Sequence, residues 1–136
     1  MNTAAVCVGI LGLLVILLGL GVSLARGQTN TVIGFNPDPT DRLYKWVRAH
    51  GNATEYNPTL AVLILYLGTR EPGGVMQGLF IAAAVSRILH AAGMIMSPSL
   101  ARPQPLRAIG AVGTYLVGLI LAVMTIVVSI RATAPG

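Results

Sequence analysis

The sequence has few charged side chains, since only 10% of its 136 residues are Asp, Glu, Lys or Arg. An average soluble domain carries about 25%, so this chain could not cover a water-facing surface with charge. A single cysteine excludes a disulfide scaffold, and aromatic residues make up only 5%. Hydrophobic residues, by contrast, reach 54%. These values exclude an ordinary soluble enzyme and a disordered segment, and they favour a polytopic membrane protein.

The hydrophobic residues gather in runs that are long enough to cross a bilayer, which takes roughly 20 predominantly apolar residues. The second run reaches this length only if the polar stretch before Pro58 is counted. We expect an all-α integral membrane protein, a four-helix transmembrane bundle with short connections. The single domain spans residues 1–136, and its helices are expected at about residues 4–25, 40–68, 75–96 and 105–131.

The net charge of +5 is distributed unevenly along the chain. Residues 70 and 131, both arginine, are the only basic residues expected beside the second connection and the C-terminus. The basic residues near the first and third connections are Arg26, Arg42, Lys45, Arg48, Arg102 and Arg107. By the positive-inside rule, these connections face the cytoplasm and both termini lie outside it. The basic excess thus indicates topology rather than nucleic-acid binding. Short loops with few charges favour a bacterial inner membrane, with a eukaryotic internal membrane as the alternative.

Polar residues line one face of the second predicted helix. Arg48, Asn52 and Glu55 follow one another at i, i+4 and i+7, and Tyr56 lies at the edge of the same face. An ionisable residue at membrane depth costs roughly 2.5–3.5 kcal/mol on insertion scales, so such residues face a bundle interior and pair there. Two interpretations stay open: a polar network that holds helices together, or a ligand site.

The balance of charges in the predicted helices favours a ligand. Glu55 is the only acid in their membrane-spanning parts, since the second helix begins before the membrane, with Asp41. The arginines set against it are Arg26, Arg48, Arg87 and Arg107, and His90 follows Arg87 by three positions. Guanidinium groups stay charged and bind carboxylates in a bidentate geometry, so we expect an anionic ligand. No metal-ligand set, Gly-rich phosphate loop or Ser/His/Asp arrangement is present.

Three motifs carry a resemblance to a known family. The segment 48–55, Arg-Ala-His-Gly-Asn-Ala-Thr-Glu, resembles the second-helix signature of the MAPEG family, the membrane-associated proteins in eicosanoid and glutathione metabolism. Residues 87–90, Arg-Ile-Leu-His, resemble the third-helix motif of its microsomal glutathione transferase and prostaglandin E synthase branch. Residues 103–108 resemble the start of that branch's fourth helix. The motifs keep the family's order and spacing, so the resemblance covers nearly the whole chain.

The resemblance implies a homotrimer that binds glutathione between subunits near the cytoplasmic face, with a lipophilic or lipid substrate arriving from the membrane. The glutathione thiolate would attack an electrophile or a lipid hydroperoxide, which would make the protein a glutathione transferase or peroxidase. Arg107 matches the arginine that stabilises the thiolate. The residues expected to bind glutathione are Arg26, Arg48, Asn52, Glu55, Tyr56, Arg87, His90 and Tyr115.

The chain departs from that branch in two places. Met94 stands where much of the branch has a tyrosine, so the hydrogen bond from that tyrosine to the ligand is either missing or supplied by Tyr56 or Tyr115. The segment 55–58, Glu-Tyr-Asn-Pro, is closer to the leukotriene synthase branch. The alternatives are a non-catalytic MAPEG-type protein that binds or presents a lipid and, more remotely, a small four-span exporter. Such exporters rely on a glutamate in the first helix, which this chain lacks.

Overall fold

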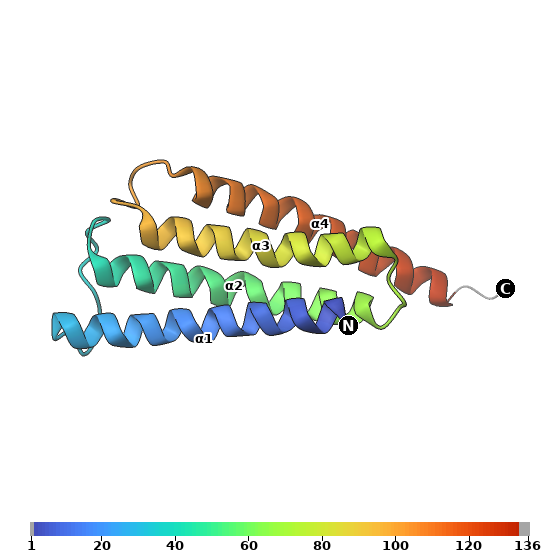
Figure 1. The fold of residues 1–136 in the computed structure, drawn as a ribbon, viewed down its shortest axis with the longest axis horizontal. Helices are drawn as coiled ribbons and strands as arrows, with labels where there is room; N and C mark the ends of the chain where they lie inside the picture. Colours follow the sequence, from blue (N-terminus) through green and yellow to red (C-terminus); the bar gives the residue numbers. More distant parts are fainter. Residues whose placement is uncertain (1, 134–136) are drawn as a thin grey trace.

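The chain folds into four long helices joined by short connections (Figure 1). The computed structural model describes residues 2–133, apart from the side chain of Thr133. The helices are α1 (Thr3–Thr29), α2 (Arg42–Gly68), α3 (Gly74–Met96) and α4 (Pro105–Thr133). No strand occurs in this part of the chain. The prediction of an all-α four-helix bundle is confirmed.

The helix ends follow from local capping chemistry. Asp41 accepts a hydrogen bond from the backbone N–H of Tyr44 at 2.8 Å, which places the start of α2 at Arg42, two residues later than expected. The first helix continues four residues beyond the expected end, because it stops only at Asn30, whose φ of 50° is left-handed. Pro105 is the first residue of α4, as expected from its missing N–H.

The connections divide the bundle into two unlike ends. The α1–α2 and α3–α4 connections lie together at one end, and the α2–α3 turn lies at the other end with the start of α1 and the end of α4 (Figure 1). We call the first of these the basic end, after the basic residues in its connections and in the adjoining turns of the helices. These residues are Arg26, Arg42, Lys45, Arg48, Arg102 and Arg107. Among the described residues α1 packs on α2 and α3, and α4 packs on α3 and α2.

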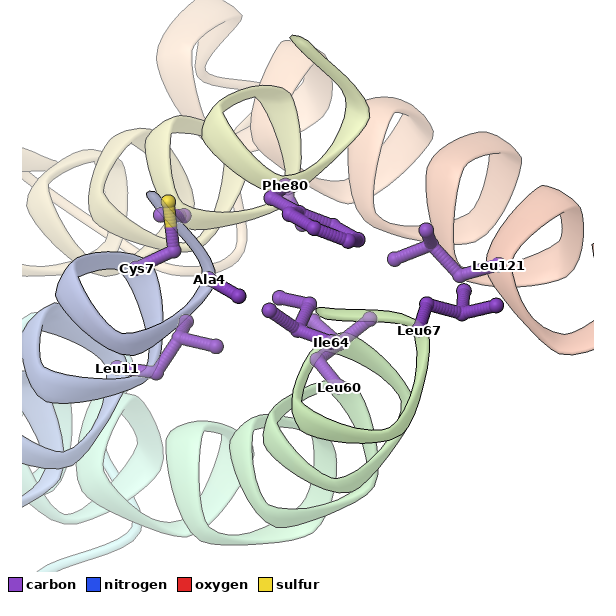
Figure 2. Close-up of a cluster of buried hydrophobic side chains, with 10 residues drawn as sticks. Ala4, Cys7, Leu11, Leu60, Ile64, Leu67, Phe80 and Leu121 are labelled. Carbon is purple, nitrogen blue, oxygen red and sulfur yellow. The ribbon is translucent and has the colours of Figure 1, made fainter. Parts of the chain in front are cut away.

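The hydrophobic core fills the half of the bundle away from the basic end. Figure 2 shows side chains from all four helices meeting there, with the Phe80 ring among them. The labelled members are Ala4, Cys7, Leu11, Leu60, Ile64, Leu67, Phe80 and Leu121. A smaller cluster lies nearer the basic end and consists of Leu18, Ala49, Ala53, Ala91 and Met94. Polar side chains are buried between these two clusters, and they form the candidate site.

The third and fourth helices approach each other unusually closely. Gly93 and Gly110 lie where the two helices touch, and a methyl group at Gly110 would collide with the backbone of His90. At Gly113 it would collide with the hydroxyl of Ser86. Small residues allow such close approach between membrane helices. This contact fixes the start of α4, including Arg107, against the end of α3.

Three helices within residues 2–133 are long and apolar enough to cross a membrane: α1, α3 and α4. Four spans were expected. The second helix has 27 residues, or about 40 Å of helix at 1.5 Å per residue, but its first half is too polar to qualify. The charged residues in that half are Arg42, Lys45, Arg48 and Glu55. The polar half of α2 is therefore the part of the bundle least suited to contact lipid.

Candidate functional site

Arg87 is the one charged side chain that is buried among residues 2–133, with 1% of its surface exposed. Its Nε donates to Oδ1 of Asn57 at 2.9 Å. Its Nη2 donates to the side-chain and backbone oxygens of Asn52 at 2.6 and 3.2 Å, and its Nη1 donates to Oγ1 of Thr114 at 3.4 Å. All of these acceptors are neutral, so the hydrogen bonds satisfy the guanidinium without cancelling its charge.

Two tyrosines lie beside this arginine. The Arg87 guanidinium carbon is 5.2 Å from the centre of the Tyr56 ring, within the range of a cation–π contact. The hydroxyls of Tyr56 and Tyr115 are 3.2 Å apart, and their rings meet edge to face with centroids 5.8 Å apart. The pair closes one end of a pocket of about 210 Å³ between α2 and α4, whose other lining residues are Thr59, Leu60, Leu63, Thr114, Gly118, Leu119 and Ala122.

The polar face predicted on the second helix divides into two parts. Asn52 and Tyr56 are half-buried and turn toward Arg87, as their hydrogen bond and ring contact show. Arg48 and Glu55 are exposed on the outer face of α2. A ligand that reached both parts would have to lie along the surface of α2, with one side against the buried arginine site.

His90 and Arg107 meet at the basic end. His90 Nδ1 donates to the backbone carbonyl oxygen of Arg107 at 3.0 Å, which leaves Nε2 available for another partner. The Arg107 guanidinium donates to the carbonyl oxygens of Leu100 and Arg102, each at 3.0 Å. Both side chains line a pocket of about 410 Å³ that is completed by Ala101, Pro103, Gln104, Ala108 and Ala111.

Arg26 holds the first connection. Its Nη1 donates to three loop carbonyls, those of Thr31, Val32 and Gly34, at 3.4, 3.3 and 2.8 Å. The side chain lines a separate hollow of about 420 Å³ at the end of α1. Arg26 therefore organises its own loop and lies in a different hollow from His90 and Arg107.

The structure thus gathers the predicted residues into separate groups. One group surrounds the buried guanidinium and consists of Asn52, Tyr56, Arg87 and Tyr115. A second consists of His90 and Arg107 in the basic-end pocket. Arg48 and Glu55 lie on the outer face of α2, and Arg26 lies at the end of α1. All of these groups belong to the half of the bundle nearer the basic end.

Asn57 belongs to the site, although its side chain was not among the predicted binding residues. It is 2% exposed and links Arg87 to α1, because its Nδ2 donates to the carbonyl oxygen of Leu11 at 2.9 Å. The sequence could have indicated this, because Asn57 follows Ala49 and Ala53 at intervals of four residues and precedes Leu60 by three, so all four lie on one face of α2. This is the buried face of α2, where the side-chain amide of an asparagine needs hydrogen-bond partners.

These features define the class of protein: a helical-bundle integral membrane protein with a polar site buried between its helices. In the described part of the chain, no group of three or more His, Cys, Asp or Glu residues could hold a metal ion. The model of the MAPEG family matches residues 4–127, and the chain belongs to that family. Comparisons with curated proteins and with solved structures gave no match. The family includes glutathione transferases as well as non-catalytic members.

Proposed function

We propose that this protein is a glutathione-dependent membrane transferase or peroxidase. The observation that carries the proposal is the excess of positive charge in one half of the bundle. Arg87 is buried among neutral acceptors, and Arg26, Arg48 and Arg107 lie in the same half with Glu55 as the one nearby acid within the helices. An anionic ligand would supply the missing negative charge.

Glutathione carries charged groups that would complement those of this site. It carries two carboxylates, one ammonium group and a thiol, which suits several arginines and one glutamate. Arg48 and Glu55 would bind its charged ends from the outer face of α2, while Asn52 and Tyr56 would contact it from the side of Arg87. Arg26, His90 and Tyr115 would complete the site, which we place near the cytoplasmic face and between neighbouring subunits.

Arg107 would activate the thiol. A free thiol of this type has a pKa near 8.5, so only a few per cent is thiolate at neutral pH. One cation about 4 Å away contributes roughly 4 kcal/mol at an effective dielectric constant of 20. About one third of that lowers the thiol pKa by one unit. The two loop carbonyls use two of the five guanidinium N–H groups of Arg107, which leaves donors for a sulfur.

The thiolate would then attack a lipophilic electrophile from the bilayer. In a transferase reaction, sulfur forms a bond to an electrophilic carbon, and the electron pair of the bond that breaks passes to the leaving atom or to an oxygen that takes up a proton. In a peroxidase reaction, sulfur attacks the terminal oxygen of a hydroperoxide, the O–O bond breaks, and the alkoxide is protonated. A second glutathione then converts the sulfenic acid to a disulfide and water.

A non-catalytic role is the second candidate, and two observations favour it. The Arg107 guanidinium is bonded to the carbonyls of Leu100 and Arg102. Met94, at the place of the branch's tyrosine, is 7% exposed and packs with Ala53 and Ala91. A protein of this kind would keep the bundle and bind a lipid without forming a thiolate. The MAPEG match over residues 4–127 argues against the exporter alternative.

A thiolate titration tests the proposal. Glutathione is added to the purified protein in detergent at neutral pH, and thiolate absorbance is followed in the wild type and in Arg107→Ala. We expect a stoichiometric signal in the wild type and its loss in the variant, with glutathione affinity largely retained. Arg102→Ala is the matched control, because it removes an exposed positive charge from the same loop.

The three outcomes of this titration have different meanings. Thiolate formation that depends on Arg107 establishes thiol activation. Glutathione binding without thiolate supports the lipid-binding alternative. If glutathione does not bind at all, the ligand that matches these arginines is a different anion, and the proposal is wrong.

A further inference from the structure

Asn57 joins three helices through one side chain. Its Oδ1 accepts from Nε of Arg87 on α3 at 2.9 Å, and its Nδ2 donates to the carbonyl oxygen of Leu11 on α1 at 2.9 Å. Arginine can only donate, so the oxygen of the amide has to face Arg87 and the nitrogen has to face Leu11. The orientation of the Asn57 amide is therefore fixed at both ends.

The α1 end of this link is rigid. Leu11 is fully buried in the core cluster, and its carbonyl belongs to the backbone of a 27-residue helix. The oxygen cannot turn away unless the helix moves. Asn57 therefore holds its acceptor oxygen at a fixed place in front of Arg87.

This placement determines where the rest of the guanidinium points. The group is planar and rigid, so a fixed Nε–H direction sets its plane. In that plane Nη2 reaches Oδ1 of Asn52 at 2.6 Å, and the guanidinium carbon lies 5.2 Å from the centre of the Tyr56 ring. Without an acceptor at Nε, the group could rotate away from both contacts.

We propose that Asn57 is a positioning residue, which orients Arg87 and thereby holds Asn52 and Tyr56 in the arrangement that receives glutathione. The inference rests on the proposed function, because Asn52 and Tyr56 are the side chains assigned to the ligand. It extends the site to α1 through the backbone carbonyl of Leu11. A purely structural tie between helices would stabilise the bundle without affecting the ligand.

The first measurement needs no thiol. In a ¹H–¹⁵N spectrum of the protein in micelles, the Nε–H of buried Arg87 is expected to exchange slowly with water, and Arg87→Lys assigns its signal. Asn57→Leu, which keeps the branching at Cγ but has no polar side-chain atoms, should lose this slow signal. Asn57→Asp keeps an acceptor for Nε and should retain it. Thr125→Val is the control, because the Thr125 hydroxyl donates to a carbonyl of its own helix, that of Leu121, at 2.8 Å.

The second measurement is glutathione affinity by calorimetry on the wild type, Asn57→Leu, Asn57→Asp and Thr125→Val. We expect Asn57→Leu to bind about tenfold more weakly than the wild type, and Thr125→Val to bind as the wild type does. Asn57→Asp should lie between them, since its carboxylate orients Arg87 but adds negative charge near an anionic ligand. If Asn57→Leu does not fold, the test rests on Asn57→Asp. A retained Arg87 Nε signal together with measurable glutathione binding in that variant supports the proposal.

The outcomes separate this inference from the proposed function. If the Arg87 signal is lost while glutathione still binds normally, Asn57 does not position the ligand groups and the inference is overturned. If both Asn57 variants bind equally weakly despite different Nε signals, Asn57 is only a tie between helices, which also overturns it. If the wild type does not bind glutathione, the proposed function fails and the positioning role fails with it.

Discussion

At the scale of single residues, neutral side chains satisfy the one buried charge of the described chain. Arg87 is bonded to two asparagines and a threonine, which come from α2 and α4. Hydrogen bonds that involve a charged partner are roughly twice as strong as neutral ones, so these amides can hold a guanidinium inside the bundle. They leave its net charge in place, and that charge is what makes the site attractive to an anion.

Arg48 and Glu55, which are exposed on the outer face of α2, give the clearest test of ligand binding at the scale of single residues. Arg48→Ala and Glu55→Gln should each weaken glutathione binding about tenfold, through loss of one charged contact. Both residues are exposed, so the free energy of unfolding should change by about 0.5 kcal/mol or less. Calorimetry and thermal unfolding measure the two effects.

A residue of the same kind outside the site serves as the control for that prediction. Arg42 is exposed in the first turn of α2, and Arg42→Ala should leave glutathione affinity unchanged. The prediction fails if Arg48→Ala and Glu55→Gln bind glutathione as well as Arg42→Ala does. In that case the polar face of α2 would have a structural role, the alternative that the sequence alone also allowed.

Much of this local picture could be predicted from the sequence, but not the network around Arg87. The i, i+4, i+7 spacing identified the polar face of α2, and a count of charges showed that arginines outnumber acids. Neither shows which amide on another helix meets which guanidinium. Asn57 was overlooked because its two partners lie 46 and 30 positions away in the chain, and only the packing of α1, α2 and α3 brings them together.

At the scale of helices, the contact between α3 and α4 is set by glycine. The Cβ of an alanine at Gly110 would collide with the backbone of His90 and the carbonyl of Ser86, neither of which can move without the helix. Gly110→Ala should lower the free energy of unfolding by about 1–3 kcal/mol, the usual cost of overpacking. Thermal unfolding in detergent, followed by circular dichroism, would measure it.

Gly9 is the matched position for this prediction, because an added Cβ there meets nothing within 4 Å. Gly9→Ala should be neutral or stabilising, since alanine favours the helix by up to about 1 kcal/mol. Equal stability of the two variants would mean that α3 and α4 do not depend on close approach at Gly110. The same displacement would shift Arg107, so Gly110→Ala should also reduce thiolate formation.

The helix bounds show what capping signals do and do not predict. Asp41 and Pro105 mark the starts of α2 and α4 within two residues of the expected positions. The end of α1 was placed too early because the expectation followed hydrophobicity, which stops at Ala25. The backbone hydrogen bonds continue through polar residues to Thr29, where the left-handed Asn30 ends the helix. Hydrophobic length predicts the membrane-spanning part of a helix, and caps predict its end.

At the scale of the whole molecule, α1 and α4 carry many exposed apolar side chains. In one subunit several of them are more than half exposed, including Leu13, Ile16, Leu24, Ile109, Leu119 and Ile126. Lipid tails cover part of such a surface, and neighbouring subunits would cover the rest. We therefore expect the homotrimer that the family resemblance implies, with the ligand site completed across subunits.

Native mass spectrometry from mild detergent tests the assembly. The subunit mass is 14.1 kDa, and the expected species has three times that mass. The sample should be one in which glutathione binding has been measured, so that assembly and function refer to the same state. A monomer or dimer that binds glutathione with full affinity would contradict a site that needs residues from neighbouring subunits.

The hydrogen bonds of Arg87 also bear on how the chain is inserted as it is made. Alone in the bilayer, an arginine in a helix costs roughly 2.5–3.5 kcal/mol on insertion scales. The acceptors of its shorter hydrogen bonds, Asn52 and Asn57, belong to α2, whereas α4 offers only Thr114 at 3.4 Å. Synthesis from the N-terminus delivers α2 before α3. The nascent chain thus has the acceptors for its most deeply buried charge in place when that charge enters the membrane.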